Sequence, residues 1–272
     1  MKKTIKSNLL DILWFLFHVF WIWSLLGATI EAFIFTIMMY SISILIAFSQ
    51  IGEWMLCLFK GAQKIVTLED ITYLEPLFDE VYEQAKKETP TIPDNIELRI
   101  IEDMTLINGY AMGTHTIAIT RGAINTQSED DLKGVIAHEF GHIVNGDTEA
   151  VLLREIGNLF FSITAFFVGW ILTFFEIMLG EAGKPIVDMF RLILDFFVGA
   201  FMFFGDLILS IDSRKNEYRA DEYASKIGYN EELKQSLYLM QRLNISNNIK
   251  LSDWIIQGHP PISKRIERLE NL

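Results

Sequence analysis

Four long apolar stretches constrain the fold of this chain more than any other feature of the sequence. Each is about 20 residues or longer, enough for a helix to cross the ~30 Å hydrocarbon core of a bilayer. Short polar turns near residues 27–31 and 180–185 join them in pairs. The sequence therefore predicts a mostly α-helical membrane protein with four transmembrane helices in two hairpins. The stretches are Leu9 to about Ile30, Phe33 to about Phe59, Leu159–Leu179 and roughly Ile186–Ile211.

Composition agrees with a membrane location and excludes several other classes of protein. Hydrophobic residues make up 51% of the chain and its mean hydropathy is +0.28, which is high for a soluble domain. A net charge of −12 argues against nucleic-acid binding. The single cysteine, Cys57, allows no intrachain disulfide and is interpreted as apolar filler. A signal peptide is the alternative for the first stretch, but a second stretch follows it at once and no small-residue cleavage site is apparent.

Basic residues bracket both hairpins on the same side. Lysines precede the first hairpin and follow it at Lys60 and Lys64, and Arg154 and Arg214 flank the second. By the positive-inside rule, both termini and the polar segments face the cytoplasm. We expect four parts: the first hairpin at 1–60, a polar segment at 61–155, the second hairpin at 156–211 and a polar segment at 212–272. The two polar segments together are about the right size for one small domain.

Several ionisable side chains fall within or beside the apolar stretches. Arg191 could pair with Asp188 or Asp195, and His18 is expected to be packed rather than to bind a ligand. Intramembrane acids are candidates for function. No role is predicted for the four acids of the second hairpin, which are Glu176, Asp188, Asp195 and Asp206.

The polar segments predict a small α+β domain. Apolar residues recur at helical spacing over 68–88, and helices are also expected over 214–227, 230–243 and 261–269. Residues 96–101 and 116–120 are typical of short strands.

Residues 138–142, His-Glu-Phe-Gly-His, indicate a metal site on a helix. Ser128 and Asp131 form a capping-box pattern before it, and an apolar stripe follows. His138 and His142 lie four residues apart, so they project from one helix face and can share a metal ion. Glu139 is placed to act as a base toward a metal-activated water. The simpler alternative is a helix with two incidental histidines.

A catalytic zinc needs a third protein ligand, and Glu217 has the best setting for it. It lies one turn into the helix that follows the second hairpin. Asp221 comes one turn later on the same face, where it can hydrogen-bond to a ligand imidazole and fix its tautomer.

These motifs in this order resemble the HtpX family of membrane-bound zinc endopeptidases, which are related to the CAAX prenyl endopeptidases and to gluzincins. The resemblance covers roughly residues 66–272. It implies a zincin-type catalytic domain with one Zn²⁺ per chain, held by His138, His142 and Glu217, with Glu139 as the general base. The matching residues are His138-Glu139-Phe140-Gly141-His142, Asn145-Gly146-Asp147, Glu217-x-x-x-Asp221 and His259-Pro260-Pro261 with Arg265.

The resemblance also implies a substrate-binding edge strand over Asn108, Gly109, Tyr110, Ala111 and Met112. Such a strand pairs with the backbone of an extended substrate. Gly109 stands where the family commonly has alanine. From the sequence alone, Asn108-Gly109 would instead be read as a hairpin turn. His115, on the next strand, is most simply structural.

In the CAAX-protease relatives, the residues that match His259 and Arg265 line the zinc site near the scissile carbonyl. The resemblance therefore implies that each stabilises the transition state, and that loss of either lowers kcat by about 10²-fold with zinc content unchanged. The alternative is a proline helix start with a solvated arginine.

The function implied by the resemblance is cleavage of misfolded or partly extracted membrane proteins at the cytoplasmic face of a bacterial inner membrane. The expected partners are extended substrate segments and the lipid bilayer, with no nucleic acid. The alternatives are a CAAX-type prenyl protease and a zinc-bound scaffold or chaperone without turnover. An intramembrane protease is disfavoured because charged residues flank the histidine helix. The substrate, the oligomeric state and the regulation are not predicted.

Overall fold

The computed structural model describes residues 16, 18–24, 26–156, 159–244 and 260–272. The chain divides into two compact units. One comprises Met1–Ala47 and Arg154–Leu209, and the other comprises Phe48–Leu153 and Ser210–Leu272.

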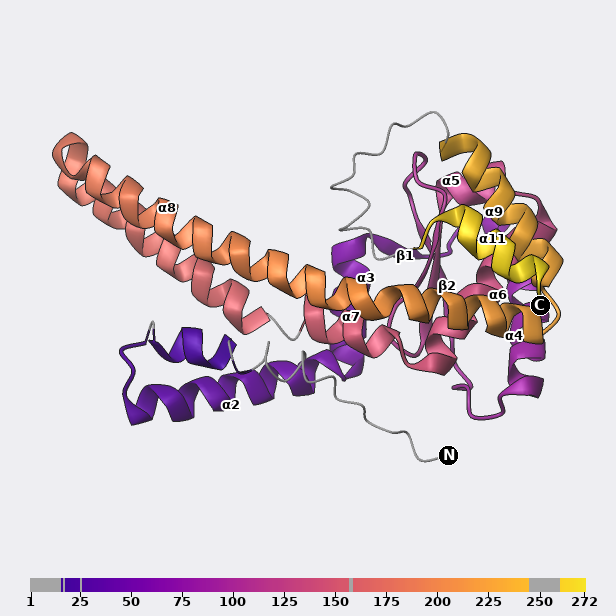
Figure 1. Cartoon of the computed structure of the whole chain (residues 1–272), viewed down its shortest axis with the longest axis horizontal. Coiled ribbons are helices and arrows are strands. Elements are labelled where there is room, and N and C mark those ends of the chain that lie inside the picture. Colours follow the sequence, from indigo (N-terminus) through magenta and orange to yellow (C-terminus); the bar gives the residue numbers. More distant parts are fainter. Residues whose placement is uncertain (1–15, 17, 25, 157–158, 245–259) are drawn as a thin grey trace. The chain divides into compact units, whose positions relative to one another are not determined.

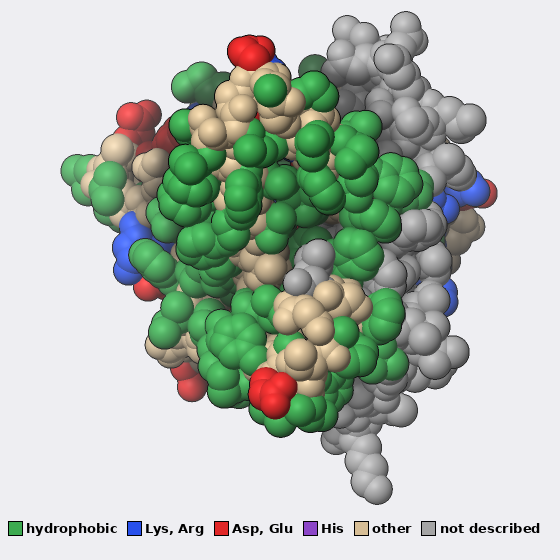
Figure 2. All heavy atoms as spheres, turned by 90° about the vertical axis from the view of Figure 1, so that its left-hand side faces the viewer, with side chains coloured by type: hydrophobic (Ala, Val, Ile, Leu, Met, Phe, Trp, Pro, Cys, Tyr) green, Lys and Arg blue, Asp and Glu red, His purple; other side chains and the backbone are tan. Residues whose placement is uncertain are grey.

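The first unit contains helix α2 and the part of α8 up to Leu209, and the rest of α8 belongs to the second unit. Helix α2 spans Ile30–Ala47, and α8 spans Leu159–Lys226 with one break at Gly180, where φ is +60° and the chain turns back (Figure 1). Glycine adopts this conformation without steric cost, so a single residue can replace the predicted six-residue turn. Two helical segments, Ile30–Ala47 and Leu159–Ala200, are long and apolar enough to cross a membrane. Hydrophobic side chains cover most of the face that Figure 2 presents.

Two sequence expectations for these stretches were wrong. The stretch from Phe33 to Phe59 is not one helix: α2 ends at Ala47, and Ser49 caps a separate helix, α3, at Gln50–Lys60. Arg191 pairs with Glu176 at 3.0 Å, across the hairpin, rather than with Asp188 or Asp195. The first predicted stretch is described only in part, because residues 9–15, 17 and 25 lie outside the described residues, so the number of four transmembrane helices stays a prediction.

His18 is packed, as expected. Its side chain is buried, and its ring stacks on Tyr40 and Phe161 with centroid separations of 5.7 and 5.5 Å.

The second unit is built on a four-stranded mixed sheet in the order β1-β2-β4-β3. Strand β2 pairs in parallel with β4, and the other two pairings are antiparallel. Strand β3 therefore forms an edge, and a strand rather than a hairpin turn begins at Gly109. It is shorter than the predicted edge strand, because Asn108 and Met112 lie outside it. The strands are β1 (Ala62–Lys64), β2 (Glu97–Ile101), β3 (Gly109–Ala111) and β4 (Thr116–Thr120).

Helices from both polar segments surround the sheet and complete one core. The core is formed by apolar side chains of α4, α6, α9 and α11 together with Ile117 and Ile119 of the central strand β4. Helix α6 packs on both α4 and α9, so it lies at the centre of this unit. The helices are α4 (Leu68–Glu88), α5 (Arg121–Thr126), α6 (Glu129–Asn145), α7 (Thr148–Glu155), α9 (Asn230–Asn244) and α11 (Ile262–Glu270).

Candidate metal centre

Helix α6 places both histidines of the motif on one buried face. The predicted capping box is present: Ser128 accepts a hydrogen bond from Asp131 N–H, and the Asp131 side chain accepts one from Ser128 N–H. The helix ends at Gly146, whose φ of +74° closes the last turn. The Nε2 atoms of His138 and His142 lie 3.2 Å apart, one helical turn from each other.

Glu217 completes a group of three donor atoms. It comes from α8, and its two carboxylate oxygens lie 3.4 Å from Nε2 of His138 and 3.5 Å from Nε2 of His142. Two donors about 2.0–2.1 Å from a tetrahedral zinc ion are about 3.3 Å apart. The separation of the two Nε2 atoms fits this value, and one donor atom from each of the three residues lies within 4.8 Å of the other two. The two-nitrogen, one-oxygen donor set is the kind that a catalytic zinc uses.

Each ligand imidazole has a carboxylate at its other nitrogen. Nδ1 of His138 lies 2.9 Å from Oδ1 of Asp221, as expected from the spacing of the second motif. Nδ1 of His142 lies 3.1 Å from Oδ2 of Asp147, a role that the sequence prediction missed. Such partners fix the ring orientation and leave Nε2 free to bind a metal. The signal in the sequence was Gly146, because a left-handed helix end turns the following residue back toward the last turn.

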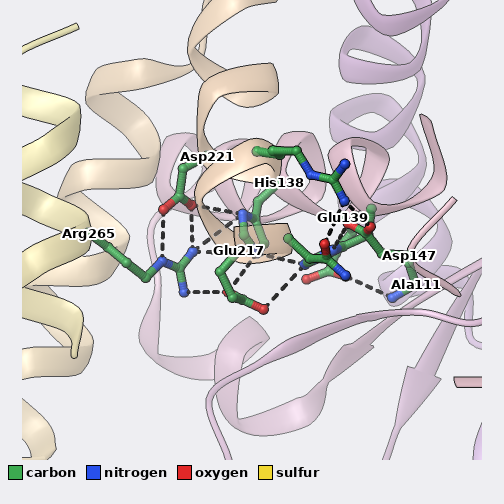
Figure 3. A network of polar contacts seen from close by, with 10 residues as sticks. Ala111, His138, Glu139, Asp147, Glu217, Asp221 and Arg265 are labelled. Atoms are coloured by element: carbon green, nitrogen blue, oxygen red, sulfur yellow. Dashed lines mark hydrogen bonds and ion pairs between the residues drawn. The ribbon is translucent and has the colours of Figure 1, made fainter. Parts of the chain in front are cut away.

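Arg265 joins this second layer of contacts. Its guanidinium binds both oxygens of Asp221 at 2.7 and 2.9 Å and lies 3.1 Å from Oε2 of Glu217 (Figure 3). The residue is only 8% exposed. In this position it neutralises and orients carboxylates around the histidines. The predicted contact with a scissile carbonyl stays a prediction, and His259 lies outside the described residues.

The electrostatics of the site favour a cation. Burial by itself lowers the pKa of His142, but Asp147 and Glu217 outweigh burial and raise that pKa to about 10. Burial raises the pKa of Asp221, whereas Arg265 and His138 overcome this effect and lower it to about 2. The carboxylates thus hold negative charge around the imidazoles, so positive charge is stabilised between them.

Glu139 connects the metal-site helix to the edge strand. It is 5% exposed, and its Oε2 accepts a 2.7 Å hydrogen bond from the backbone N–H of Ala111. A Cβ added at Gly109 would lie 2.9 Å from Cγ of Glu139 and 2.8 Å from Cγ1 of Val135. The absence of a side chain at Gly109 therefore lets β3 approach the carboxylate directly.

Gly141 sets the distance between the two helices that carry the ligands. A Cβ there would lie 2.7 Å from Cα and 2.8 Å from the carbonyl oxygen of Ala220, between Glu217 and Asp221. We expect Gly141→Ala to push α8 away from α6 and to lower zinc affinity at least about tenfold. This is the effect of losing a residue that hydrogen-bonds to a metal ligand. Zinc content after dialysis against a competing chelator measures this effect.

Gly199→Ala on α8 is the matched control, because a Cβ there meets nothing within 4 Å. Equal zinc retention by the two variants would show that the close contact at Gly141 does not position Glu217.

Comparisons with known proteins agree with this site. Residues 72–272 match peptidase family M48. The chain is 26% identical over 237 residues to "Protease HtpX" of Shewanella oneidensis, covering 81% of this chain and 82% of the relative. It is 27% identical over 209 residues to "Protease HtpX" of Haemophilus influenzae, covering 72% and 73%.

Among solved structures, the S. mikatae Ste24p crystal structure has a similar fold, with a TM-score of 0.55 and 19% identity. The match covers 94% of this chain but 62% of that protein, so this chain spans less than two thirds of its length. The family match covers about three quarters of the chain and includes the three donor residues, the edge strand and Arg265. The chain therefore belongs to peptidase family M48 and resembles the HtpX proteases within it.

Proposed function

We propose that this protein is a membrane-embedded, zinc-dependent endopeptidase that cleaves extended polypeptide segments. The observation that carries the proposal is the position of Glu139. Glu139 directly follows His138 on α6, and its carboxylate is hydrogen-bonded to an edge strand (Figure 3). A purely structural metal site needs neither a neighbouring base nor a strand on which a substrate can pair.

His138, His142 and Glu217 would hold one zinc ion per chain. When bound, zinc lowers the pKa of a coordinated water toward ~7 and polarises a carbonyl group. The protein residues supply the remaining functions. Asp221 and Asp147 orient the two imidazoles, and Arg265 pairs with Asp221 and Glu217 and holds them in place.

Glu139 would act as the proton carrier of the hydrolysis. Its carboxylate accepts a proton from the attacking water and delivers it to the amine of the departing peptide. The hydrogen bond from Ala111 N–H holds the Glu139 carboxylate in one orientation. This preorganisation lowers the reorganisation cost of the proton transfers.

Strand β3 would bind the substrate backbone. Thr120 N–H donates to Asn108 C=O and Met112 N–H donates to Thr116 C=O, so these residues direct their polar groups toward β4. Because backbone groups alternate along an antiparallel strand, the carbonyls of Gly109 and Ala111 face the open edge. An extended substrate can donate its N–H groups to them, whereas a folded segment has no backbone groups to offer.

This requirement supports misfolded or partly extracted membrane proteins as substrates, cut at the cytoplasmic face. A CAAX-type prenyl protease and a scaffold without turnover remain the alternatives. The test is incubation of the detergent-purified protein with an unfolded soluble protein and with matched prenylated and unprenylated peptides. We expect internal cleavage of the unfolded protein that a chelator abolishes and added zinc restores. Cleavage of the prenylated peptide alone would indicate the CAAX activity, and no cleavage with zinc bound would indicate the scaffold.

The orientation in the membrane gives a separate prediction. The turn at Gly180 should lie on the outer side, because basic residues bracket the hairpin at its other end. In intact cells, a cysteine replacing the exposed Glu181 should react with an impermeant thiol reagent added outside. A cysteine replacing the exposed Glu69 should react only after the membrane is opened. The reverse pattern would contradict the cytoplasmic placement of the site.

A further inference from the structure

Helix α3 is a separate amphipathic helix rather than the end of a transmembrane span. Its N-terminus is capped by the Ser49 side chain, which accepts hydrogen bonds from Ile51 N–H and Gly52 N–H. Its C-terminus is closed by Gly61 at φ +69°. At 1.5 Å per residue, its 11 residues extend about 16 Å, which is too short to cross a bilayer.

The two faces of α3 have different surroundings. Gly52, Leu56 and Cys57 are buried within the second unit. Ile51, Trp54 and Leu58, at positions i, i+3 and i+7, form a continuous outer stripe and are 60%, 58% and 60% exposed. Three large apolar side chains on one short helix mark a surface that contacts something apolar.

A short connection joins α3 to a candidate membrane span. Helix α2 ends at Ala47, three residues before α3 begins, so the two ends are within about 11 Å of each other. The stripe contains a tryptophan, and Lys60 and Lys64 follow it. Tryptophan and lysine beside an apolar stripe are typical of helices that lie in the headgroup region of a bilayer.

Glu53 of α3 forms hydrogen bonds with the turn that follows the edge strand. The Glu53 carboxylate accepts hydrogen bonds from Thr114 N–H at 2.8 Å, Thr114 Oγ1–H at 3.0 Å and His115 N–H at 3.3 Å. A Cβ at Gly113, where φ is +72°, would lie 2.3 Å from Cδ of Glu53. Residues 112–115 join β3 to β4, so Glu53 holds the end of the edge strand.

We propose that α3 lies in the lipid headgroup region of the bilayer and that Glu53 thereby fixes the edge strand at a set height above the membrane. The inference rests on the proposed membrane location and substrate strand. It makes Glu53 a positioning residue for substrate binding. In this arrangement the apolar stripe contacts lipid and not a second protein.

Fluorescence quenching by lipids tests the first part. In a Cys57→Ala background, single cysteines at Ile51, Met38 and Met104 carry an environment-sensitive dye. The full-length protein is reconstituted in vesicles whose lipids are brominated near the headgroup or near the chain end. Met38 lies near the middle of α2, and Met104 is a 71% exposed residue in the β2–β3 connection.

We expect Ile51→Cys to be quenched most by bromine near the headgroup, Met38→Cys most by deep bromine, and Met104→Cys by neither. Quenching at Met38 without quenching at Ile51 would overturn the inference and leave the membrane location intact. Strongest quenching of Ile51 by deep bromine would also overturn it. Absence of quenching at Met38 would overturn the proposed membrane span itself.

Substrate kinetics test the second part. Glu53→Ala should raise the KM for an extended peptide roughly tenfold, because the turn loses the hydrogen bonds that hold it and part of the binding free energy must then order the edge strand. The kcat and the zinc content should change less than about twofold, since the strand binds ground state and transition state alike. Glu53→Gln keeps one acceptor oxygen, so its KM should lie between those of the unmodified protein and Glu53→Ala. Glu69→Gln, an exposed change on α4, is the control. An unchanged KM for Glu53→Ala, or a joint loss of kcat and zinc, would contradict the positioning role.

Discussion

Glu139→Gln is expected to lower kcat by about 10²- to 10⁴-fold while the protein keeps its zinc. Glutamine has the same shape, and its carbonyl oxygen can still accept the hydrogen bond from Ala111 N–H. It cannot accept a proton from water at neutral pH, so the base is lost and the geometry is kept. Glu139 is not one of the three donor residues, so metal binding should change little.

Glu217→Gln is the informative comparison, because it removes the carboxylate that belongs to the donor set. Its oxygens lie 3.4 and 3.5 Å from the two imidazole nitrogens. A neutral amide is a poorer zinc ligand, and we expect affinity to fall by more than the 10–100-fold typical of outer-layer partners. Zinc content and single-turnover cleavage should be measured on both variants. Equal zinc content and equal residual cleavage in the two would refute this division of roles.

Arg265→Met is expected to destabilise the full-length protein by about 3–5 kcal/mol, the cost of removing one partner from a buried ion pair. Asp221 is 1% exposed and Glu217 is 3% exposed, so both carboxylates would lose a counter-charge in a buried setting. Adding Asp221→Asn should recover part of the loss, because it removes one of the orphaned charges. The free energy of unfolding of each detergent-purified variant should be measured from its unfolding over a series of denaturant concentrations.

Arg219→Met provides the control for this effect. Arg219 also pairs with a carboxylate of the site, Asp147 at 2.9 Å, but its side chain is 52% exposed. An exposed pair contributes at most about 1 kcal/mol. If both variants lose equal stability, Arg265 does not hold the buried carboxylates. The family resemblance predicts instead a loss of kcat with zinc unchanged, so both quantities should be measured on Arg265→Met.

The sequence predicted the second unit well where local signals agreed with one another. The helix predicted at 68–88 is α4, Leu68–Glu88, because Thr67 caps it and its apolar residues keep helical spacing. Strand Thr116–Thr120 was also found, since its short β-branched run is bounded by turn residues. His138, His142 and Glu217 come together as predicted, because their spacing reflects the geometry of a metal site.

What the sequence did not predict depends on tertiary contacts or on polar residues within apolar runs. Strand β1, Ala-Gln-Lys, is too short and too polar to be distinguished from a loop without its partner β2. Ser49 ends one helix and caps the next inside a continuous apolar stretch, and hydropathy alone does not register such a cap. The pairing of Arg191 with Glu176 requires knowing where the hairpin turns.

The order in which the donor residues are synthesised has a consequence for the cell. His138 and His142 precede the long hairpin of α8, and Glu217 follows it. Arg265, which neutralises the carboxylates, is made still later. Because chains are made and begin to fold from the N-terminus, a nascent molecule holds two donors but not the third. Chains truncated before Glu217 should therefore bind zinc weakly, so the complete donor set forms only after the hairpin of α8 has been synthesised.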